Sequence, residues 1–376
     1  MIYFDNSATT IQKPPSVAIE MAQSIGTLGN PSRSFHDPAL ASSRTLLKAR
    51  SEVASLVGAH SPLSVAFTSG ATESLNLVIS SLISSDCHVI TTVLEHNSVL
   101  RPLYLSGCEL SILPCDDEGK LCLEGLPSLL QSNTKALVAT HGSNLLGGIS
   151  CVDRLRDFCK EHGLYFILDV SQTLGSVPVG AEMADVLCFT GHKGLMGPQG
   201  TGGIVATSPL PFSLVKTGGA GSDSFAPHQS LDFPDIFEAG TPNTHGLAGL
   251  SAAVSFLNEV TVEQISSHES TLCARLLEGL EQIDGVRIFG SRSSEDRLPV
   301  VGFLLGDRSA EEVSLQLWEG WQIATRAGSH CAPLLHERFG TQNRGMMRVS
   351  LGYYNKMDEV ESFLSALDAI ARGCSS

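Results

Sequence analysis

Short apolar runs alternate with amphipathic stretches between about Ser64 and Thr207, and this alternation limits the possible fold of the chain more than any other feature. It is typical of a largely parallel sheet whose strands are covered by helices. The candidate strands are the seven runs Ser64–Thr68, His88–Thr92, Leu110–Leu113, Ala136–Thr140, Phe166–Asp169, Val186–Phe189 and Gly203–Ala206. Glu73–Leu82 and Val152–His162 have helical spacing, and Gly163 follows the second at a C-cap position. The sequence therefore predicts one broad α/β sheet of seven strands.

Residues 207–245 are rich in glycine, proline and serine and show little periodicity, so we expect a functional loop region there. Helical patterns and short strands alternate again beyond about residue 250. The predicted helices are Ala252–Glu259, Ser270–Gln282, Glu311–Glu319 and Met357–Ala371, and the predicted strands are Val300–Leu305 and Met346–Leu351. We predict a large domain over residues 15–245 and a smaller α/β domain formed by residues 1–14 and 246–376.

Composition argues against several classes of partner. The formal net charge is -15 and no Lys/Arg cluster offsets it, so neither nucleic acid nor an anionic membrane surface is an expected partner. The ten cysteines include no C-x-x-C pair, which argues against a zinc site and fits a reducing cytoplasm. We find no basic and apolar leader at Met1 and no run of about 20 apolar residues. We therefore expect a cytoplasmic protein without a metal site or membrane anchor.

Polar residues follow several predicted strands, where ligands bind in open α/β sheets. Thr68-Ser-Gly-Ala-Thr72 is a turn of small residues between a strand and a helix. Its free backbone N–H groups and the helix dipole could bind an anion, to which Thr72 would add a hydroxyl. An ordinary capped turn would have the same sequence, so this motif alone is weak.

Two further strand ends carry a carboxylate and a lysine. Asp169 can pair with a protonated pyridine nitrogen, and Gln172 can donate to a ring hydroxyl. Lys193, in Thr190-Gly-His-Lys193, can lose its proton and condense with an aldehyde. Each has an ordinary alternative, a strand-end acid or a surface turn. Together with the phosphate turn they are the three anchors that a pyridoxal 5'-phosphate (PLP) ring requires.

Two side chains beyond other strand ends extend this constellation. His96 follows the strand after the phosphate turn, so its ring could stack on the cofactor and move protons, although a hydrogen-bonded loop histidine is the alternative. Asn144 also lies past a strand end and could hydrogen-bond the ring or the substrate.

The second half of the chain adds a thiol and two arginines. Cys331 lies in a loop beside His330 and near Arg326, and nearby positive charge favours a nucleophilic thiolate. Arg348 is a charge within an apolar strand, which needs either a bound carboxylate or an internal acid as its partner. A substrate carboxylate would meet that need.

These residues resemble those of the cysteine desulfurases and selenocysteine lyases, which belong to the class V aminotransferase group of fold type I PLP enzymes. The resemblance extends over essentially the whole chain, and its motifs occur in the family's order. They are Tyr3–Thr10, Asn30–Ser32, Thr68–Ser74, Glu95–Asn97, Asp169–Gln172, Gly191–Lys193, Glu238–Asn243, Arg326–Pro333 and Arg348–Asn355. The resemblance implies a large PLP-binding domain and a small domain that carries the catalytic cysteine and the carboxylate-binding arginine.

The resemblance also implies a role for each candidate residue. Lys193 would hold PLP, Asp169 would pair with the ring nitrogen, Gln172 would contact the ring oxygen, and His96 would stack. The phosphate would be bound by Thr72, Thr190 and His192, and by Thr241 from the other subunit of a homodimer. Arg348 would bind the substrate carboxylate, with Arg326 and Asn144 close to the substrate, and Cys331 would accept sulfur. The short spacing from Cys331 to Arg348 resembles members with a compact cysteine loop.

Two departures from the family's pattern concern the cofactor loops. Ala71 stands in the phosphate turn where the family often has a second threonine, so one hydroxyl contact is missing. The turn after Lys193 is one residue longer than in the commonest desulfurase pattern. These departures affect the expected substrate more than the fold or cofactor.

The implied reaction converts cysteine to alanine. The Lys193 amine would remove the Cα proton, and Cys331 would attack the substrate sulfur and become a persulfide, from which an acceptor protein or a reductant would take the sulfur. Selenocysteine lyase is the nearest alternative, and a class V aminotransferase would leave Cys331 without a role. A binding or regulatory module on the same fold is the alternative outside enzymes.

Overall fold

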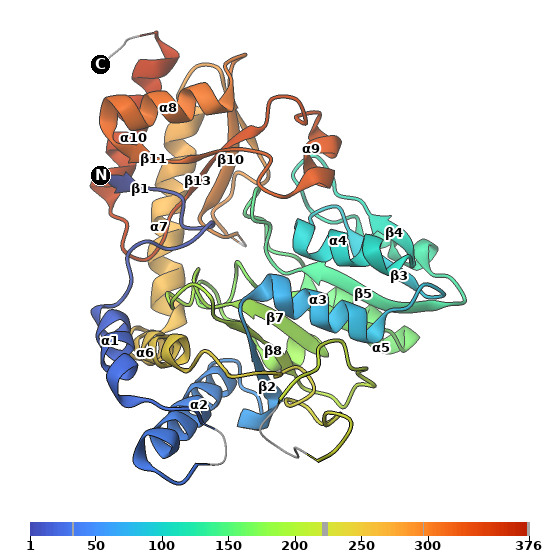
Figure 1. The fold of residues 1–376 in the computed structure, drawn as a ribbon. Coiled ribbons are helices and arrows are strands. Elements are labelled where there is room, and N and C mark those ends of the chain that lie inside the picture. Colours follow the sequence, from blue (N-terminus) through green and yellow to red (C-terminus); the bar gives the residue numbers. More distant parts are fainter. Residues whose placement is uncertain (32–33, 220–224, 296, 374–376) are drawn as a thin grey trace.

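The computed structural model describes residues 1–31, 34–219, 225–295 and 297–373. Its larger sheet has seven strands in the order β2-β8-β7-β6-β5-β3-β4 (Figure 1). The strands are β2 (Val65–Thr68), β3 (His88–Thr92), β4 (Glu109–Leu113), β5 (Thr134–Thr140), β6 (Tyr165–Asp169), β7 (Val186–Thr190) and β8 (Gly202–Ala206). Each predicted run forms one of these strands, so the prediction of a seven-stranded sheet is confirmed.

The sheet is mostly parallel, and only β8 is antiparallel to its neighbours β2 and β7. Strands buried on both faces carry continuous apolar sequence, and every residue of β7 is buried. Successive side chains point to opposite faces. On β6, Ile167 packs in one hydrophobic cluster, whereas Phe166 and Leu168 pack in another.

Helices cover both faces of this sheet (Figure 1). The cluster around Ile167 includes residues of α3 (Ala71–Leu82) and α4 (Asn97–Ser106). The opposite cluster includes residues of α2 (Asp37–Leu56), α5 (Val152–His162) and α6 (Thr244–Val260). The predicted helix at Val152–His162 is confirmed, and Gly163 caps it in the left-handed conformation at φ 64°. The seven-stranded sheet and the helices on its two faces therefore form a three-layer α/β unit.

A second sheet lies in the C-terminal part of the chain, with strand order β12-β13-β10-β9. Its strands are β9 (Val286–Phe289), β10 (Val300–Leu305), β12 (Arg326–Gly328) and β13 (Met346–Ser350). The helices of this part are α7 (Val262–Glu281), α8 (Ala310–Trp321), α9 (Pro333–Phe339) and α10 (Met357–Ala371). The predicted smaller α/β layer is confirmed in these elements.

The N-terminal residues join this second layer. Strand β1 (Ile2–Tyr3) pairs in parallel with β11 (Ile323–Ala324), and Phe4 packs edge-to-face on Phe363 with ring centroids 5.8 Å apart. The helix that follows, α1 (Pro15–Thr27), lies against α6 (Figure 1). These contacts support the predicted assignment of residues 1–14 to the small domain, whose boundaries remain a prediction.

The segment between β8 and α6 forms neither helix nor strand in its described residues 207–219 and 225–243. This agrees with the predicted loop region. Residues 220–224 of that loop, and Ser32 of the Asn30–Ser32 motif, lie outside the described residues. Helix α6 begins earlier than the predicted Ala252, because the Asn243 side chain accepts a hydrogen bond from the Gly246 N–H at 3.0 Å and caps it. No helix in the described ranges is long and apolar enough to cross a membrane.

Candidate active site

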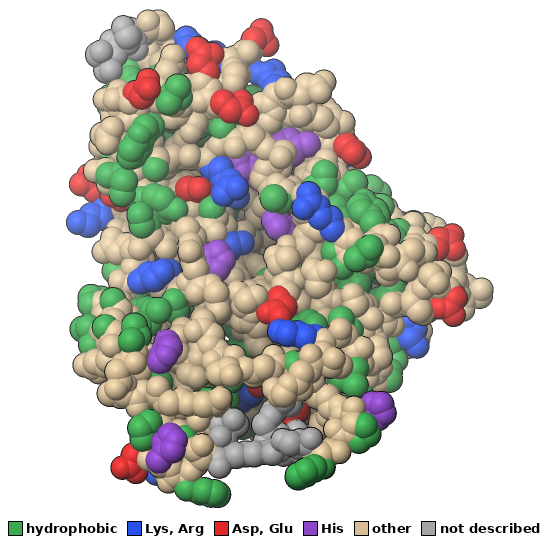
Figure 2. Space-filling view, viewed as in Figure 1, with side chains coloured by type: hydrophobic (Ala, Val, Ile, Leu, Met, Phe, Trp, Pro, Cys, Tyr) green, Lys and Arg blue, Asp and Glu red, His purple; other side chains and the backbone are tan. Residues whose placement is uncertain are grey.

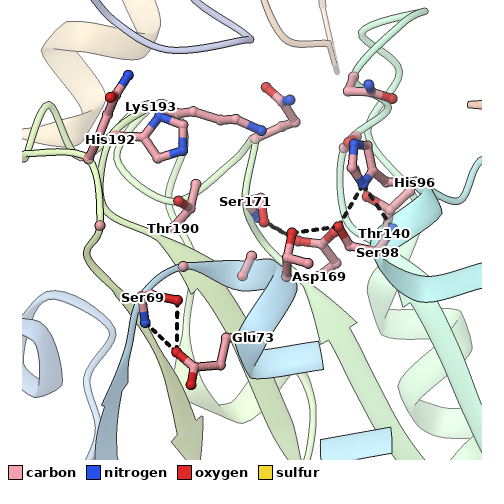
Figure 3. Close-up of a pocket in the computed structure, with 18 residues that line it drawn as sticks. Ser69, Glu73, His96, Ser98, Thr140, Asp169, Ser171, Thr190, His192 and Lys193 are labelled. Atoms are coloured by element: carbon pink, nitrogen blue, oxygen red, sulfur yellow. Dashed lines mark hydrogen bonds between the residues drawn. The ribbon is translucent and has the colours of Figure 1, made fainter. Parts of the chain in front are cut away.

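A cavity of about 290 Å³ opens where three neighbouring parallel strands end (Figure 3). Thr140, Asp169 and Thr190 are the last residues of β5, β6 and β7, and all three line it. The structure also brings most of the predicted cofactor residues to its wall. These are Ala71, Thr72, His96, Asn144, Asp169, Gln172, Thr190, His192 and Lys193. The cavity has the size of a small-cofactor site at the expected edge of the sheet.

The N-terminus of α3 forms one wall. Gly70 precedes the helix at φ 151°, a conformation that other residues rarely adopt. The backbone N–H groups of Ala71 and Thr72 have no acceptor in the described part of the chain, so they are available to an anion. Glu73 already accepts from the Ser69 N–H at 2.7 Å and from its hydroxyl at 2.8 Å. The Thr72 hydroxyl bonds to the Ser98 hydroxyl at 2.8 Å.

Asp169 is held in place by the residue two positions after it. The Ser171 N–H donates to Asp169 Oδ1 at 2.9 Å, and the Ser171 hydroxyl donates to the same oxygen (Figure 3). Asp169 Oδ2 accepts no hydrogen bond from the described residues. One carboxylate oxygen is therefore anchored, and the other is available to a cationic ring nitrogen.

Lys193 reaches into the same cavity from the loop after β7 (Figure 3). Burial lowers the pKa of its amine to about 8; Asp169 opposes this shift, whereas Arg348 and Arg326 add to it. A substantial fraction of the amine is therefore neutral near pH 8 and can act as a nucleophile or base. The neighbouring His192 has a buried Nδ1 without a partner among the described residues, and burial lowers its pKa to about 4.

His96 is both a helix cap and a cavity residue. Its Nδ1 accepts from the Ser98 N–H at 3.0 Å and caps α4. The ring is therefore the tautomer with its proton on Nε2. Burial lowers the His96 pKa to about 4, so the ring is neutral at physiological pH. His96 is therefore a hydrogen-bonded histidine, as the alternative interpretation of the sequence expected. Its stacking on the cofactor remains a prediction.

Gln172 and Asn144 line the cavity but make protein contacts. Gln172 Nε2 donates to the Ser7 carbonyl at 3.2 Å, and Asn144 Nδ2 donates to the His330 carbonyl at 2.6 Å. Asn144 thereby connects the cavity wall to the loop that carries Cys331.

The Cys331 loop is fixed by its backbone. The Asn97 N–H, at the first position of α4, donates to the Cys331 carbonyl at 2.9 Å. His330 Nε2 donates to the Met346 carbonyl at 3.0 Å. His330 and Cys331 have positive φ values of 49° and 56°, which are costly for non-glycine residues and persist only where the surroundings hold them. The Cys331 residue is exposed, so its thiol is accessible to a second molecule.

Arg348 has an internal acid as its partner. Arg348 Nη2 lies 2.6 Å from Asp5 Oδ1, and Arg326 Nη1 lies 3.8 Å from Asp5 Oδ2. Arg348 Nη1 also donates to the Asn144 carbonyl at 3.0 Å. Of the two partners that the sequence left open, a substrate carboxylate and an internal acid, the structure shows the acid. Neither arginine belongs to the wall of the 290 Å³ cavity, to which Arg348 is joined through Asn144.

Thr241 lies apart from the other predicted phosphate ligands. It lines a different cavity of about 800 Å³, together with Arg50, Lys216 and Glu238. Within one chain the structure therefore does not bring Thr241 to Lys193. Its contact with the phosphate of a second subunit stays a prediction.

Sequence reasoning missed several residues that shape the site. Ser98 and Ser171 orient His96 and Asp169, and each follows its partner by two positions, which is a recognisable turn signal. Glu95 is fully buried, and its Oε1 accepts from the Thr92 hydroxyl at 2.5 Å and the Thr140 N–H at 2.9 Å. Burial raises the Glu95 pKa to about 8. No sequence signal shows that burial.

Positive charge gathers around the site despite the acidic chain. Lys13 contributes to the low pKa of His192, and Arg101 to that of His96. Figure 2 shows several Lys and Arg side chains across the middle of the face viewed, with a few Asp and Glu side chains among them. This local positive potential attracts anionic ligands, although the net charge of the whole protein repels them.

The fold and this site are those of a class V aminotransferase. The Aminotransferase class-V family profile matches residues 2–363, and the chain belongs to this family. Its full-length relatives include a probable cysteine desulfurase of Pyrococcus abyssi, 31% identical over 99% of this chain and 94% of that protein. A cysteine desulfurase of Cronobacter sakazakii is 32% identical over 99% of this chain and 94% of its own length.

Solved structures agree with these relatives. The apo structure of the cysteine desulfurase from Thermococcus onnurineus has a TM-score of 0.93 and 31% identity, and covers 99% of this chain and 95% of that one. A cysteine desulfurase of Escherichia coli, determined in an S-sulfonic acid form, has a TM-score of 0.87 and 28% identity, with 99% and 94% coverage. The similarity therefore includes both the seven-stranded sheet and the four-stranded sheet.

The class V family is PLP-dependent, and the residues present fit that cofactor. The N–H groups of Ala71 and Thr72 are unused, and the buried His192 Nδ1 lacks a partner in the described ranges. These groups suit a phosphate, whereas the available Asp169 oxygen and the Lys193 amine suit the ring and its aldehyde.

Proposed function

We propose that this protein is a PLP-dependent cysteine desulfurase that converts L-cysteine to L-alanine and receives the sulfur on Cys331. The observation that carries the proposal is the exposed Cys331 on a loop whose backbone is bound to Asn97 and, through His330, to Asn144. A transaminase would need no such thiol. Full-length similarity to cysteine desulfurases supports the same assignment.

Bound PLP would supply an electron sink for the charge that develops at the substrate Cα. We propose that the backbone N–H groups of Ala71 and Thr72 bind its phosphate, that Asp169 Oδ2 pairs with its ring nitrogen, and that His96 covers its face. Ser171 keeps the Asp169 carboxylate oriented toward the ring. These residues bind and orient, and none of them needs to move during the reaction.

Lys193 is the proposed base. Its amine, with a pKa of about 8, can accept the Cα proton from the substrate and return a proton to the carbon fragment. The neutral His96 has its remaining N–H on Nε2, which can donate but not accept a proton. Lys193 is therefore the group that can accept the Cα proton beside the PLP ring.

Cys331 is the proposed nucleophile. Its thiolate Sγ forms a bond to the substrate sulfur while the carbon–sulfur bond breaks, and the carbon fragment takes up a proton and leaves as alanine. The product on the enzyme is a Cys331 persulfide, and a thiol of an acceptor protein or small reductant then removes the outer sulfur. Exposure of Cys331 makes that second transfer sterically accessible.

The test is turnover of L-cysteine by the PLP-loaded protein, with alanine and sulfide quantified in the presence of a reductant. Cys331→Ser should lower alanine formation at least about 100-fold, and Lys193→Ala should lower it about 1000-fold or more. Cys151→Ser, at another exposed cysteine, is the matched control and should leave turnover unchanged. Full alanine formation by Cys331→Ser would refute the nucleophile, and turnover of selenocysteine alone would identify a selenocysteine lyase.

We also propose that the active form is a homodimer in which Thr241 of one subunit reaches the phosphate site of the other. The support is that Thr241 lies outside the Lys193 cavity of its own chain. Light scattering should give twice the mass of one chain, and Thr241→Ala should weaken PLP binding. A monomeric, fully active protein would exclude this arrangement.

A further inference from the structure

Two arginines lie opposite each other on neighbouring strands of the four-stranded sheet. Arg326 on β12 is the direct cross-strand partner of Arg348 on β13, so both side chains lie on the same face of this antiparallel pair. Like charges directly opposite one another destabilise a sheet. Arg348 is also deeply buried, with only 2% of its side chain exposed. Such a pair requires negative charge close by.

The N-terminal segment delivers that charge. The Phe4 N–H donates to the Ala324 carbonyl at 2.9 Å, and the Ser350 N–H donates to the Phe4 carbonyl at 2.8 Å. Asp5, the next residue, forms a parallel bridge with Ser350. The backbone thus fixes Asp5 beside the ends of β11 and β13, where its two carboxylate oxygens reach one arginine each.

The charges in this cluster do not balance. Two guanidinium groups face one carboxylate, and no other acid in the described residues forms an ion pair with either arginine. Arg348 Nε is buried and has no acceptor within the same residues. Burial lowers the pKa of Arg348, and Asp5 only partly opposes that shift. The Arg326 side chain is 45% exposed, so water can solvate part of its charge, whereas the buried Arg348 Nε lacks an acceptor. A carboxylate would supply that acceptor and a second negative charge.

We propose that Asp5 is a positioning residue that holds Arg348 and Arg326 together as a preformed receptor for the carboxylate of an amino-acid substrate. Asp5 fixes Nη2 of Arg348, and the Asn144 carbonyl fixes Nη1, so the guanidinium plane cannot rotate. A preoriented guanidinium loses less entropy when it binds a carboxylate. The inference rests on the proposed function, because it assigns the amino-acid carboxylate to that same site.

The test compares a ligand that has the carboxylate with one that lacks it. The dissociation constants of L-alanine and ethylamine are measured on the PLP-loaded protein from the change in cofactor absorbance. Asp5→Asn should weaken alanine binding about 10-fold or more, because a misoriented guanidinium forms weaker charge-assisted hydrogen bonds with the carboxylate. Ethylamine, which does not use the arginines, should bind within about 2-fold of the wild type.

Two further variants keep the comparison decisive. Asp5→Glu retains the charge on a longer side chain, so its alanine affinity should lie between those of the wild type and Asp5→Asn. If Asp5→Asn does not fold, the same comparison of alanine and ethylamine is made with Asp5→Glu. Asp117→Asn removes the acid from an exposed pair, 2.7 Å from Arg338, and should change neither affinity. Equal weakening of alanine and ethylamine, or unchanged alanine binding, would overturn the proposal. Alanine contains no sulfur, so a protein that fails to desulfurate cysteine would refute the proposed function and leave this test intact.

Discussion

Asn144 Nδ2 lies 2.6 Å from the His330 carbonyl oxygen, and the Asn144 carbonyl accepts from Arg348 Nη1 at 3.0 Å. One residue of the cavity wall therefore holds both the loop of the proposed nucleophile and the arginine of the proposed carboxylate site. His330 and Cys331 have left-handed backbone conformations that need such support. The distance between the substrate and the thiol thus depends in part on this amide, together with the Asn97 and Met346 contacts of the loop.

The first prediction concerns this amide. Asn144→Ala should lower the rate of persulfide formation on Cys331 about 10- to 100-fold, because the loop loses its hydrogen bond and a small misplacement of reacting atoms is costly. The rate is measured in single-turnover experiments with cysteine, and the persulfide is detected by mass spectrometry. Asn76→Ala removes an exposed amide on α3 and serves as the control. An unchanged rate in Asn144→Ala would show that the other loop contacts suffice.

The second prediction concerns the pH dependence of cofactor uptake. The Lys193 amine has a pKa of about 8, and only its neutral form attacks an aldehyde. The rate at which the apo protein takes up PLP should therefore rise with pH through about 8 and then level off. The measurement is the growth of the cofactor absorbance after mixing. Asp169 raises the pKa of this amine, so Asp169→Asn should move the midpoint to lower pH.

The third prediction concerns the serine that holds Asp169. Ser171→Ala removes the hydroxyl hydrogen bond to Oδ1 but keeps the backbone one. A hydrogen bond to a charged group contributes about 1.5–3 kcal/mol, so PLP affinity should fall about 10-fold. Fluorescence titration of the apo protein measures it. Ser365→Ala, on the exposed face of α10, should have no effect.

The fourth prediction concerns the buried Glu95. Its pKa is raised from 4.5 to about 8 in the folded protein, whereas the unfolded chain releases this proton near 4.5. The folded state therefore binds more protons between these values, and the contribution of Glu95 to stability falls as pH rises from about 4.5 to about 8. Glu95→Gln stays neutral and should lose less thermal stability than the wild type across that range.

Thermal unfolding at several pH values measures this difference. Glu319→Gln, on the surface of α8, should follow the wild-type curve. Parallel curves for Glu95→Gln and the wild type would show that Glu95 is ionised when folded.

Much of the large sheet could be predicted because its signal is local. A buried parallel strand must be apolar along its length. All seven apolar runs form strands, although β8 is antiparallel to its neighbours and β4 is only partly buried. The strand-end positions of Asp169 and Lys193 were readable for the same reason, since parallel strands bring their carboxyl ends to one edge. Helix α6 begins at Thr244 instead of the predicted Ala252, and its Asn243 cap is a local signal that the prediction did not use.

The sequence by itself determined the residue types of the site, including the Lys193 amine, the Asp169 carboxylate, the Cys331 thiol and the Arg348 guanidinium. Only the tertiary structure decided their partners. Asp5 meets Arg348 across most of the length of the chain, and Asn144 meets His330 from 186 positions away in the sequence. Such contacts depend on how distant segments pack, and burial then sets the pKa of groups such as Lys193. Sequence spacing cannot encode either effect, because both depend on what surrounds a side chain in space.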